Sequence, residues 1–522
     1  MLVLGPLLRY VDETSATIWV ETDRPCRVSV LGAESPTFTV HGHHYALVDV
    51  TGLEPGSSTP YEVHLDGERC WPLPMNPPSR IRTLSSRPLR LAFGSCRTSV
   101  PHNDEFNRTH GYDVLHMFGK RLMSLPESQW PDLLLMLGDQ VYADQPSAPL
   151  LELIERRRGL DEPPGAELAD FEEYTELYRL AWSERINRWL LSTVPSMMIF
   201  DDHDIRDDWN TSLAWREQMA AQPWWPKRII GGLAAYWVYQ HAGNLSVTER
   251  GKDPVLADLR AATGDAGEIL DRHAADADAR PETIRWSFAR DIGRVRLVVL
   301  DSRCGRVLIP GRRAILDEQE WAWFDDLARG DVDHLLIGTS LPYLLPRGVH
   351  ELELWNEAIS DGRGPLARLG ERIRQELDLE HWSAFRASFD AMAALLAEVI
   401  SGRRGAPPAS IVLLSGDVHY SYLMRVEGSP IYQAVCSPIR NPLPQSMRYA
   451  NILASFGVAG VVGRLLARSA GLPQPHLQWH LTRRPMFDNA IATLELTGRR
   501  ASVRWETASA NELVTLYEVQ LS

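Results

Sequence analysis

The sequence predicts a layered α/β domain with buried strands, preceded by a small β-sandwich. Short segments that alternate apolar and polar residues fill residues 1–70, whereas continuous apolar runs alternate with helical stretches further along the chain. Alternation is typical of half-buried antiparallel strands, and continuous apolar runs are typical of parallel strands covered on both faces. A chain of 522 residues also exceeds the size at which one core stops growing, which favours at least two units.

The first unit is expected over residues 1–86. Gly, Pro and Asp separate its strand candidates, which are "ATIWVET", "RVSVLG", "TFTVHG", "YALVDVTGL" and "YEVHLDG". Helical periodicity is absent, so this pattern indicates a small β-sandwich. The stretch "WPLPMNPPSRIRTLSSRP" at 71–88 is rich in Pro and Ser and is predicted to be a linker.

The second unit is expected over residues 87–522. Its apolar runs are "LRLAFGSC", "PDLLLMLGD", "PSMMIFDD", "VRLVVLDSR", "HLLIGTSLP" and "SIVLLSGDVH", and helical stretches such as 166–192 and 381–401 separate them. This alternation predicts α/β layers. Several runs end in a polar cluster, and ligands of α/β sheets bind outside the carboxyl ends of the strands.

The charge of the chain restricts its partners. The net charge is 54 − 68 = −14, which disfavours a nucleic acid or an anionic membrane as partner. For the chain to bind a small phosphate compound, metal ions or a local Arg cluster would have to make the electrostatic potential at the binding site positive. The five scattered cysteines predict no disulfide framework and fit a reducing compartment. The N-terminus lacks a convincing signal peptide, and its apolar stretch is too short to span a membrane. We therefore expect a cytoplasmic protein.

Four strand ends carry the residues of interest: "GSCR", "LGDQVYAD", "FDDHD" and "SGDVHYS". The third is the densest, since five aspartates occupy positions 201–208 directly after "VPSMMIF". Partly buried carboxylates cost several kcal/mol each unless a cation pairs with them. Thiolate and phenolate ligands favour a transition metal such as ferric iron, whereas carboxylates suit Ca²⁺, Mg²⁺ or Mn²⁺. Two such metals would suit the in-line displacement of a phosphoryl group.

Together, "FGSC", "GDQVYAD", "DDHD" and "SGDVHYS" resemble the motif series of the alkaline phosphatase D (PhoD)-like metallophosphatases, and they occur in that family's order between residues 91 and 422. The resemblance covers nearly the whole chain. It implies a four-layer α/β-β/α metallophosphatase sandwich preceded by a small all-β domain of the immunoglobulin or fibronectin type. It also implies that residues 87–522 form the catalytic domain.

The resemblance further implies a role for each motif residue. An iron-like site would be held by Cys96, Asp139 and Tyr142, with His419 as a further ligand. Asp139 would bridge to a second metal bound by Asp202 and Asp417. His203 would contact the phosphate and protonate the leaving group, and Arg97 would steady a phosphate oxygen.

The motifs also depart from the wider metallophosphatase pattern. The usual DxH is replaced by Ser95-Cys96, the usual GNH by residues 201–203, and the usual GHxH by residues 416–419. Thr339 and Ser340 stand where many relatives carry a metal-binding His. The second metal therefore lacks nitrogen ligands, which favours a hard ion such as Ca²⁺, with Mn²⁺ or Mg²⁺ as alternatives.

Other polar residues have less specific interpretations. We expect Asp201 and Asp204 to support the site or cap a helix. Two alternatives stay open for the next stretch: Asp207, Asp208 and Asn210 shape the substrate pocket, or Asn210 or Ser212 caps the helix that follows. Packing is expected for Lys227 and Arg228, an exposed loop for His350, a solvated strand for "HGHHY" (41–45), and a packed helix or lid for 454–471.

The leading hypothesis is a metal-dependent phosphoesterase that hydrolyses small phosphate mono- or diesters by attack of a metal-activated hydroxide. The alternative is a non-catalytic binding module in which the metal cluster is structural and the N-terminal sandwich engages a partner. His203 and Arg97 favour the enzyme, since a purely structural site needs neither.

Overall fold

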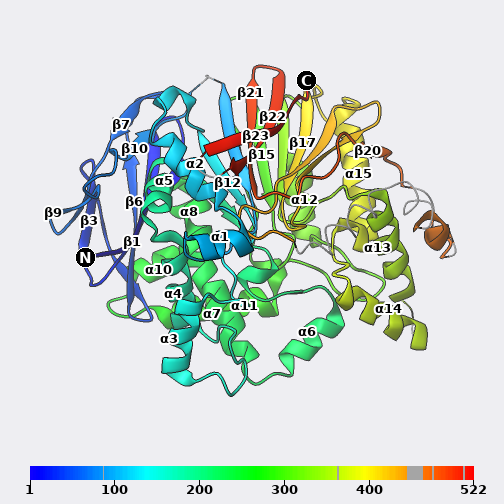
Figure 1. Cartoon of the computed structure of the whole chain (residues 1–522), viewed down its shortest axis with the longest axis horizontal. Helices are drawn as coiled ribbons and strands as arrows, with labels where there is room; N and C mark the ends of the chain where they lie inside the picture. The colour runs from blue at the N-terminus through cyan, green and yellow to red at the C-terminus, as the bar shows by residue number, and fades with distance from the viewer. Residues whose placement is uncertain are drawn as a thin grey trace.

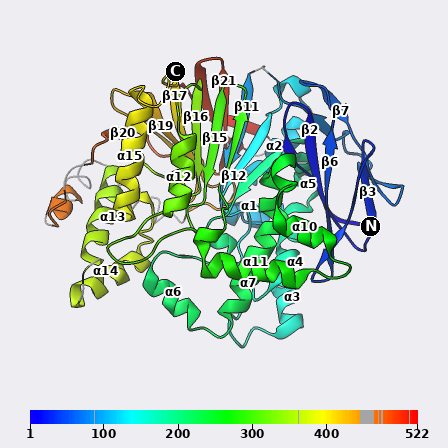
Figure 2. The same cartoon turned by 180° about the vertical axis from the view of Figure 1, so that it is seen from behind.

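An all-β unit comes first, and a larger body of two sheets between helices follows it (Figures 1 and 2). The computed structural model describes residues 1–85, 88–360, 362, 364–443, 463–468, 470–472, 475–509 and 512–522. Most of the stretch 454–471, predicted as a packed helix or lid, lies outside the described residues. No helix in the described ranges combines the length and the apolar character needed to cross a membrane.

The N-terminal unit contains two four-stranded antiparallel sheets and a two-stranded ribbon. The strand orders are β1-β2-β6-β5, β4-β3-β8-β9 and β10-β7. The strands are β1 (Leu2–Val11), β2 (Ser15–Thr22), β3 (Arg27–Val30), β4 (Ala33–Pro36), β5 (Phe38–Val40), β6 (His43–Thr51), β7 (Ser58–Pro60), β8 (Val63–Leu65), β9 (Glu68–Trp71) and β10 (Arg80–Arg82). Because β10 pairs with β7, part of the predicted linker is a strand instead.

Two mixed sheets form the centre of the second unit. Their strand orders are β13-β12-β11-β21-β22-β23 and β14-β15-β16-β17-β19-β18-β20. The strands are β11 (Leu89–Gly94), β12 (Leu133–Leu137), β13 (Ser196–Ile199), β14 (Phe288–Ile292), β15 (Val295–Leu300), β16 (His334–Thr339), β17 (Ser410–Ser415), β18 (Tyr422–Val426), β19 (Ile431–Val435), β20 (Trp479–Leu481), β21 (Ala490–Thr497), β22 (Arg500–Ser509) and β23 (Glu512–Gln520). The six predicted apolar runs are β11, β12, β13, β15, β16 and β17, which pair in parallel within each sheet.

Helices cover the outer face of each sheet, which completes the predicted four-layer sandwich (Figures 1 and 2). On one side, Phe389 and Leu396 of α15 pack against Ile337 and Leu413 of the second sheet. On the other side, α2 lies against β21, β22 and β23. The longer helices are α1 (Asp104–His110), α2 (Val114–Leu122), α3 (Ala148–Arg158), α4 (Phe171–Trp182), α5 (Arg185–Thr193), α6 (Leu213–Ala220), α7 (Trp225–Tyr236), α10 (Pro254–Ala261), α11 (Gly267–Ala279), α12 (Glu318–Leu327), α13 (Arg347–Ser360), α14 (Pro365–Glu376) and α15 (Arg386–Ile400). Shorter helical turns are η1 (Glu127–Gln129), η2 (Asp202–Asp204), η3 (Trp237–His241), α8 (Ala242–Asn244), α9 (Val247–Arg250), η4 (Pro281–Thr283) and η5 (Trp382–Ala384).

The helix predicted over 166–192 is two helices, α4 and α5. The Glu184 side chain accepts hydrogen bonds from the amides of Ile186 and Asn187, so it caps a new helix at that point. The apolar periodicity continues through the break, which is why the sequence alone suggests one helix.

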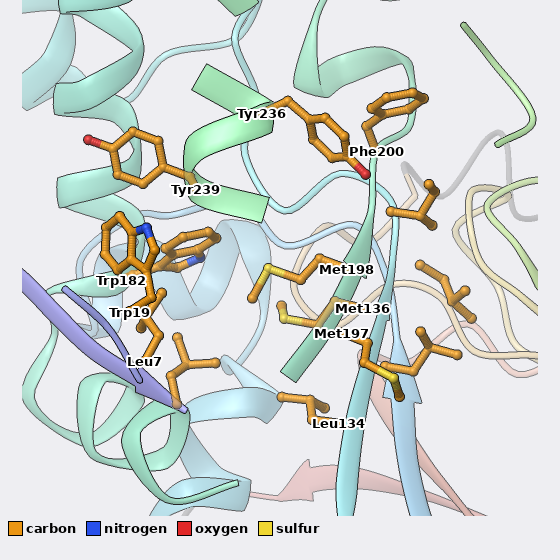
Figure 3. Close-up of a cluster of buried hydrophobic side chains, with 14 of the residues drawn as sticks. Leu7, Trp19, Leu134, Met136, Trp182, Met197, Met198, Phe200, Tyr236 and Tyr239 are labelled. Carbon is orange, nitrogen blue, oxygen red and sulfur yellow. The ribbon is translucent and has the colours of Figure 1, made fainter. Parts of the chain in front are cut away.

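The N-terminal unit shares its core with the second unit. Leu7 and Trp19 lie beside Trp182 and Tyr239, and the Trp19 and Tyr239 rings are 5.3 Å apart between centroids (Figure 3). Met198 belongs to the same buried cluster. Removing residues 1–86 would therefore expose apolar core, and not merely a partner-binding surface.

Arg9 of β1 fixes this junction by polar contacts. Its buried guanidinium donates to the carbonyl oxygens of Ser196 (3.0 Å), Tyr239 (2.6 Å) and Gln240 (2.7 Å). Burial lowers the pKa of Arg9 to about 9.

We expect Arg9→Met to lower the free energy of unfolding by about 3 kcal/mol or more, because the variant leaves several buried carbonyl groups without a donor. Chemical denaturation of the full chain measures this change. The matched control, Arg24→Met, removes only an exposed ion pair with Asp66 and should cost less than about 1 kcal/mol. Equal effects in the two variants would contradict the assignment.

Candidate metal centre

The four predicted motifs lie at neighbouring strand ends. β11, β12, β13 and β17 end at Gly94, Leu137, Ile199 and Ser415, and each motif follows directly. β11, β12 and β13 run parallel within the first sheet, as β15, β16, β17 and β19 do within the second. The chain after each strand therefore emerges beside the others, at the edge where α/β proteins bind ligands.

The backbone is strained where the motif side chains are presented. Cys96, Asp139, Asp417 and His419 have φ angles of 55°, 52°, 65° and 56°, in the left-handed region. Such a conformation costs of order 1 kcal/mol or more for a residue other than Gly, and it clusters at functional sites. Side-chain and backbone contacts hold it in place, for example the Asp139 amide, which donates to the Asp204 carboxylate at 2.9 Å.

Two glycines allow the loops to approach each other this closely. A Cβ at Gly138 would lie 2.5 Å from Cβ of Asp201, and one at Gly416 would lie 2.2 Å from Cβ of Ser95. Both distances are shorter than any real carbon contact, so the motifs meet only because these positions carry no side chain.

Cys96, Asp139, Tyr142 and His419 come together as the sequence predicts. Sγ of Cys96 lies 3.3 Å from Oδ2 of Asp139, and Oη of Tyr142 lies 3.5 Å from Nε2 of His419. One ligand atom each from Cys96, Asp139 and His419 lies within 4.8 Å of the others. Burial, aided by the charge of Asp417, raises the pKa of the Cys96 thiol to about 12, so a thiolate here needs a nearby cation.

The carboxylates form two further groups beside the first. Asp201, Asp202 and Asp417 converge within 4.8 Å, and so do Asp139, Asp202 and His203. Asp139 therefore belongs both to the group with Cys96 and to a group with Asp202. This is the position a bridging ligand would occupy between two ions.

The oxygen atoms of these acids fit a metal centre. Oδ1 of Asp139 and Oδ2 of Asp201 are buried, and each lacks a hydrogen-bond donor among the described residues. Burial, together with the charge of neighbouring groups, raises the pKa of Asp139 and Asp201 well above the usual value for a carboxyl. Acceptor oxygens that are buried without donors are the atoms a hard cation would bind.

His203 is held by a carboxylate of the second motif. Its Nδ1 lies 2.8 and 3.0 Å from the two carboxylate oxygens of Asp144, and its ring packs on Tyr142 with centroids 4.6 Å apart. Burial alone would lower the pKa of His203, but the charges of Asp144 and Asp202 raise it well above the ordinary value. Its Nε2 lies 3.6 Å from Oδ1 of Asp207, and both residues line the pocket.

Arg97 does not line the pocket. Its buried guanidinium donates to the Asp113 carboxylate at 2.7 Å and to the Ala181 carbonyl at 2.9 Å. Asp113 in turn caps α2, and neither Arg97 nor Asp113 belongs to the pocket lining. The phosphate contact expected for Arg97 therefore lacks a geometric basis here.

Arg303 contacts the carboxylates of the site, and the sequence analysis did not identify it. Its Nη2 lies 3.2 Å from Oδ1 of Asp202 and 3.7 Å from Oδ1 of Asp417, and the guanidinium also contacts Asp201 and Glu380. In the sequence, Arg303 follows the apolar run of β15 in "VRLVVLDSR", just as the four motifs follow other apolar runs. This position after a buried strand marks Arg303 as a candidate site residue.

His381 is a second residue that the sequence did not reveal. Its Nε2 lies 2.9 Å from Oδ2 of Asp417, and its Nδ1 lies 2.7 Å from Oε1 of Glu353. Because His381 precedes the short turn η5 and follows no strand, no pattern in the sequence marks it.

A pocket of about 610 Å³ opens over these residues. Its lining includes acidic residues, among them Asp207, Asp378 and Glu380, and apolar residues such as Leu345 and Leu379. Within the described part of the chain, its lining includes histidines but neither Arg nor Lys. A phosphate group would therefore depend on bound cations and histidines for its recognition.

Of the other predictions made from the sequence, some are confirmed and some are wrong. Ser212 caps α6, and Asp204 supports the loop of Asp139, as expected. His350 is fully buried in α13 and bonded to Ser383, so the exposed-loop prediction is wrong. His41 lies in a turn with φ of 50°, so the strand-face argument fails for it. Lys227 and Arg228 pair with Asp170 and Glu167, away from the pocket.

Comparison with known proteins adds an independent result. Residues 116–252 match the family model of the PhoD-like phosphatases, and residues 1–83 match a domain of unknown function, DUF7800. No curated protein matches the chain. The match over residues 116–252 includes the motifs of Asp139, Tyr142 and His203.

A solved structure shows the same fold. A structure titled "Structure of PhoD" superposes with a TM-score of 0.61 and 12% sequence identity, covering 100% of this chain and 92% of the other. A structure of GAP50, the anchor in the inner membrane complex of Plasmodium, gives a TM-score of only 0.35 at 9% identity, covering 84% of this chain and 89% of the other. At this identity the first match establishes the architecture alone. Residues 116–252 are therefore similar in sequence to the PhoD-like phosphatases, and the chain as a whole shares its fold with the structure of PhoD.

Proposed function

We propose that this chain hydrolyses phosphate esters at two cations held by the strand-end motifs. The observation that carries the proposal is the place of Asp139, which shares one ligand group with Cys96 and His419 and another with Asp202. A single structural ion would need only one of these groups. Two cations, when bound, would lower the pKa of water and neutralise charge on the transferring phosphoryl group.

The donor sets differ between the two sites, and this difference supports different metals. Cys96, Tyr142 and His419, with Asp139, supply a thiolate, a phenolate and an imidazole, which suit Fe³⁺. Asp202 and Asp417, with Asp139, supply oxygen only, which suits Ca²⁺, or else Mn²⁺ or Mg²⁺.

His203 is the proposed proton donor to the leaving oxygen. The Asp144 carboxylate accepts a hydrogen bond from Nδ1, which fixes the ring orientation, and its charge stabilises the imidazolium form that also carries a proton on Nε2. The raised pKa of His203 supports a charged imidazole at neutral pH, as a general acid requires.

A phosphodiester substrate fits the pocket better than a monoester. A dianionic monoester would need cationic side chains to grip it, and both Arg97 and Lys227 are engaged elsewhere. The acidic wall formed by Asp207, Asp378 and Glu380 would repel the extra charge of a monoester. The binding-module alternative has no comparable support, because a structural ion would not require His203 and Asp144 beside an open pocket.

His203→Ala should lower kcat for a chromogenic phosphodiester by about 10²–10⁴-fold while leaving metal content unchanged, because the variant removes a general acid and no ligand. Asp144→Asn should lower kcat by about 10–100-fold, since it disturbs only the orientation of the ring. Kinetics combined with elemental analysis tests both. Loss of metal in His203→Ala would show that His203 is a ligand instead.

Tyr142→Phe should remove the phenolate part of the visible charge-transfer absorption of the iron site and leave the thiolate part from Cys96, while calcium or manganese content stays the same. Absorption spectra and elemental analysis of the two proteins check this. The control is Tyr420→Phe, which changes another buried tyrosine that lines the pocket. An unchanged spectrum in Tyr142→Phe would remove Tyr142 from the metal site.

The metal-free protein should lose stability as pH rises from about 6.5 to 9. Burial and neighbouring acids raise the pKa of Asp208 to about 9 and of Asp378 to about 7, so the folded state keeps protons that the unfolded state has released. Each such proton lowers the free energy of unfolding by up to about 1.4 kcal/mol per pH unit. Below pH 6.5 the effect is opposed, because burial lowers the pKa of His241 and His350 to about 3.

Denaturant unfolding in a chelating buffer measures this slope, and saturating Ca²⁺ should reduce or reverse it, since the cation binds the ionised acids. A stability that rises with pH in the chelated protein would contradict the charge assignment.

A further inference from the structure

A second cluster of metal-ligating side chains lies outside the pocket, where α2 meets the start of α5. It contains His102 from the loop before α1, His116 of α2, and Glu184, which caps α5. One ligand atom from each residue lies within 4.8 Å of the other two. None of the three lines the pocket. The cluster is therefore separate from the centre described above.

His116 and Glu184 are already spaced as ligands of one ion. Nδ1 of His116 lies 3.1 Å from Oε2 of Glu184. Two ligand atoms at about 2.0–2.2 Å from a tetrahedral zinc ion are roughly 3.4 Å apart. A zinc ion could thus replace the shared proton after a movement of a few tenths of an ångström.

His102 is held from behind by a carboxylate. Its Nε2 lies 2.9 Å from Oδ2 of Asp113, and its ring centroid lies 4.3 Å from that of His116. Asp113 is buried and fixed in turn by Arg97. Metal-binding histidines commonly contact a carboxylate through one nitrogen and the metal through the other. Asp113 leaves the second nitrogen of His102 for an ion.

The cluster is open to solvent. The side chains of His102, His116 and Glu184 are 24%, 19% and 31% exposed, so an ion and its water can enter. Two imidazoles and one carboxylate are a ligand set that zinc accepts, with water at the fourth position.

We propose that His102, His116 and Glu184 form a zinc site distinct from the pocket. Zinc at this site ties the loop of His102 to α2 and α5. The proposal does not depend on the phosphoesterase activity, because it uses none of the residues assigned to that activity.

Zinc titration of the full-length protein tests the proposal, with a competing chromogenic chelator and elemental analysis after desalting. The wild type should retain one more equivalent of zinc than the double variant His102→Asn/His116→Asn. Glu184→Gln should bind that equivalent at least tenfold more weakly, while its amide oxygen can still cap α5. Zinc should raise the melting temperature of the wild type more than that of the double variant.

Two further variants separate the sites. His110→Asn changes a nearby histidine on α1 that belongs to no ligand group and should bind zinc like the wild type. His419→Asn alters the pocket and should retain the extra equivalent. Circular dichroism of the zinc-free variants verifies that each is folded. Equal zinc content in the wild type and the double variant, or loss of the extra equivalent in His419→Asn, would overturn the proposal.

Discussion

The concentration of buried carboxylates at one edge of two sheets is the constraint on which the rest of the structure depends. Asp202 shares one group with Asp201 and Asp417 and another with Asp139, and burial would drive these acids toward the neutral form. Only positive charge can hold such a group ionised. Much of the surrounding architecture supplies that charge or positions it.

The protein's own cations compensate only part of this charge. Arg303 contacts Asp201, Asp202 and Glu380, and His381 contacts Asp417. These contacts stabilise one side of the carboxylate group and lower the pKa of Asp417 far below the usual value. They do not reach Oδ1 of Asp139, which stays buried without a donor among the described residues. Oδ2 of the same carboxylate lies 3.3 Å from Sγ of Cys96, so a metal ion beside Asp139 is the natural counter-charge.

Sequence patterns predicted the parts of the site that are local. An apolar run followed at once by acids, as at Asp139, Asp201 and Asp417, indicates both a buried strand and the edge to which it delivers its side chains. The direction in which a side chain points after its strand, however, is not determined by the local sequence. Arg97 and Arg303 each follow a buried strand, yet one turns toward the cap of α2 and the other toward the carboxylates.

The dependence on tertiary contacts also explains the other features that the sequence did not predict. His381 reaches Asp417 only through tertiary packing, and the break between α4 and α5 depends on a cap by Glu184 inside a continuous apolar pattern. The layered fold was predictable because every apolar run indicates a buried strand of the same sheets. Each of these contacts, in contrast, depends on a single side chain.

The N-terminal unit has a physical part in maintaining the site. β1 and β2 share a core with α4 and the segment around Tyr239, and Arg9 binds the carbonyl of Ser196 at the start of β13. β13 leads directly to Asp201 and Asp202. Ligand loops in left-handed conformations persist only if the strands before them are rigid. The sandwich therefore buttresses the strand that presents the densest group of acids, which accounts for its tight packing without invoking a separate partner.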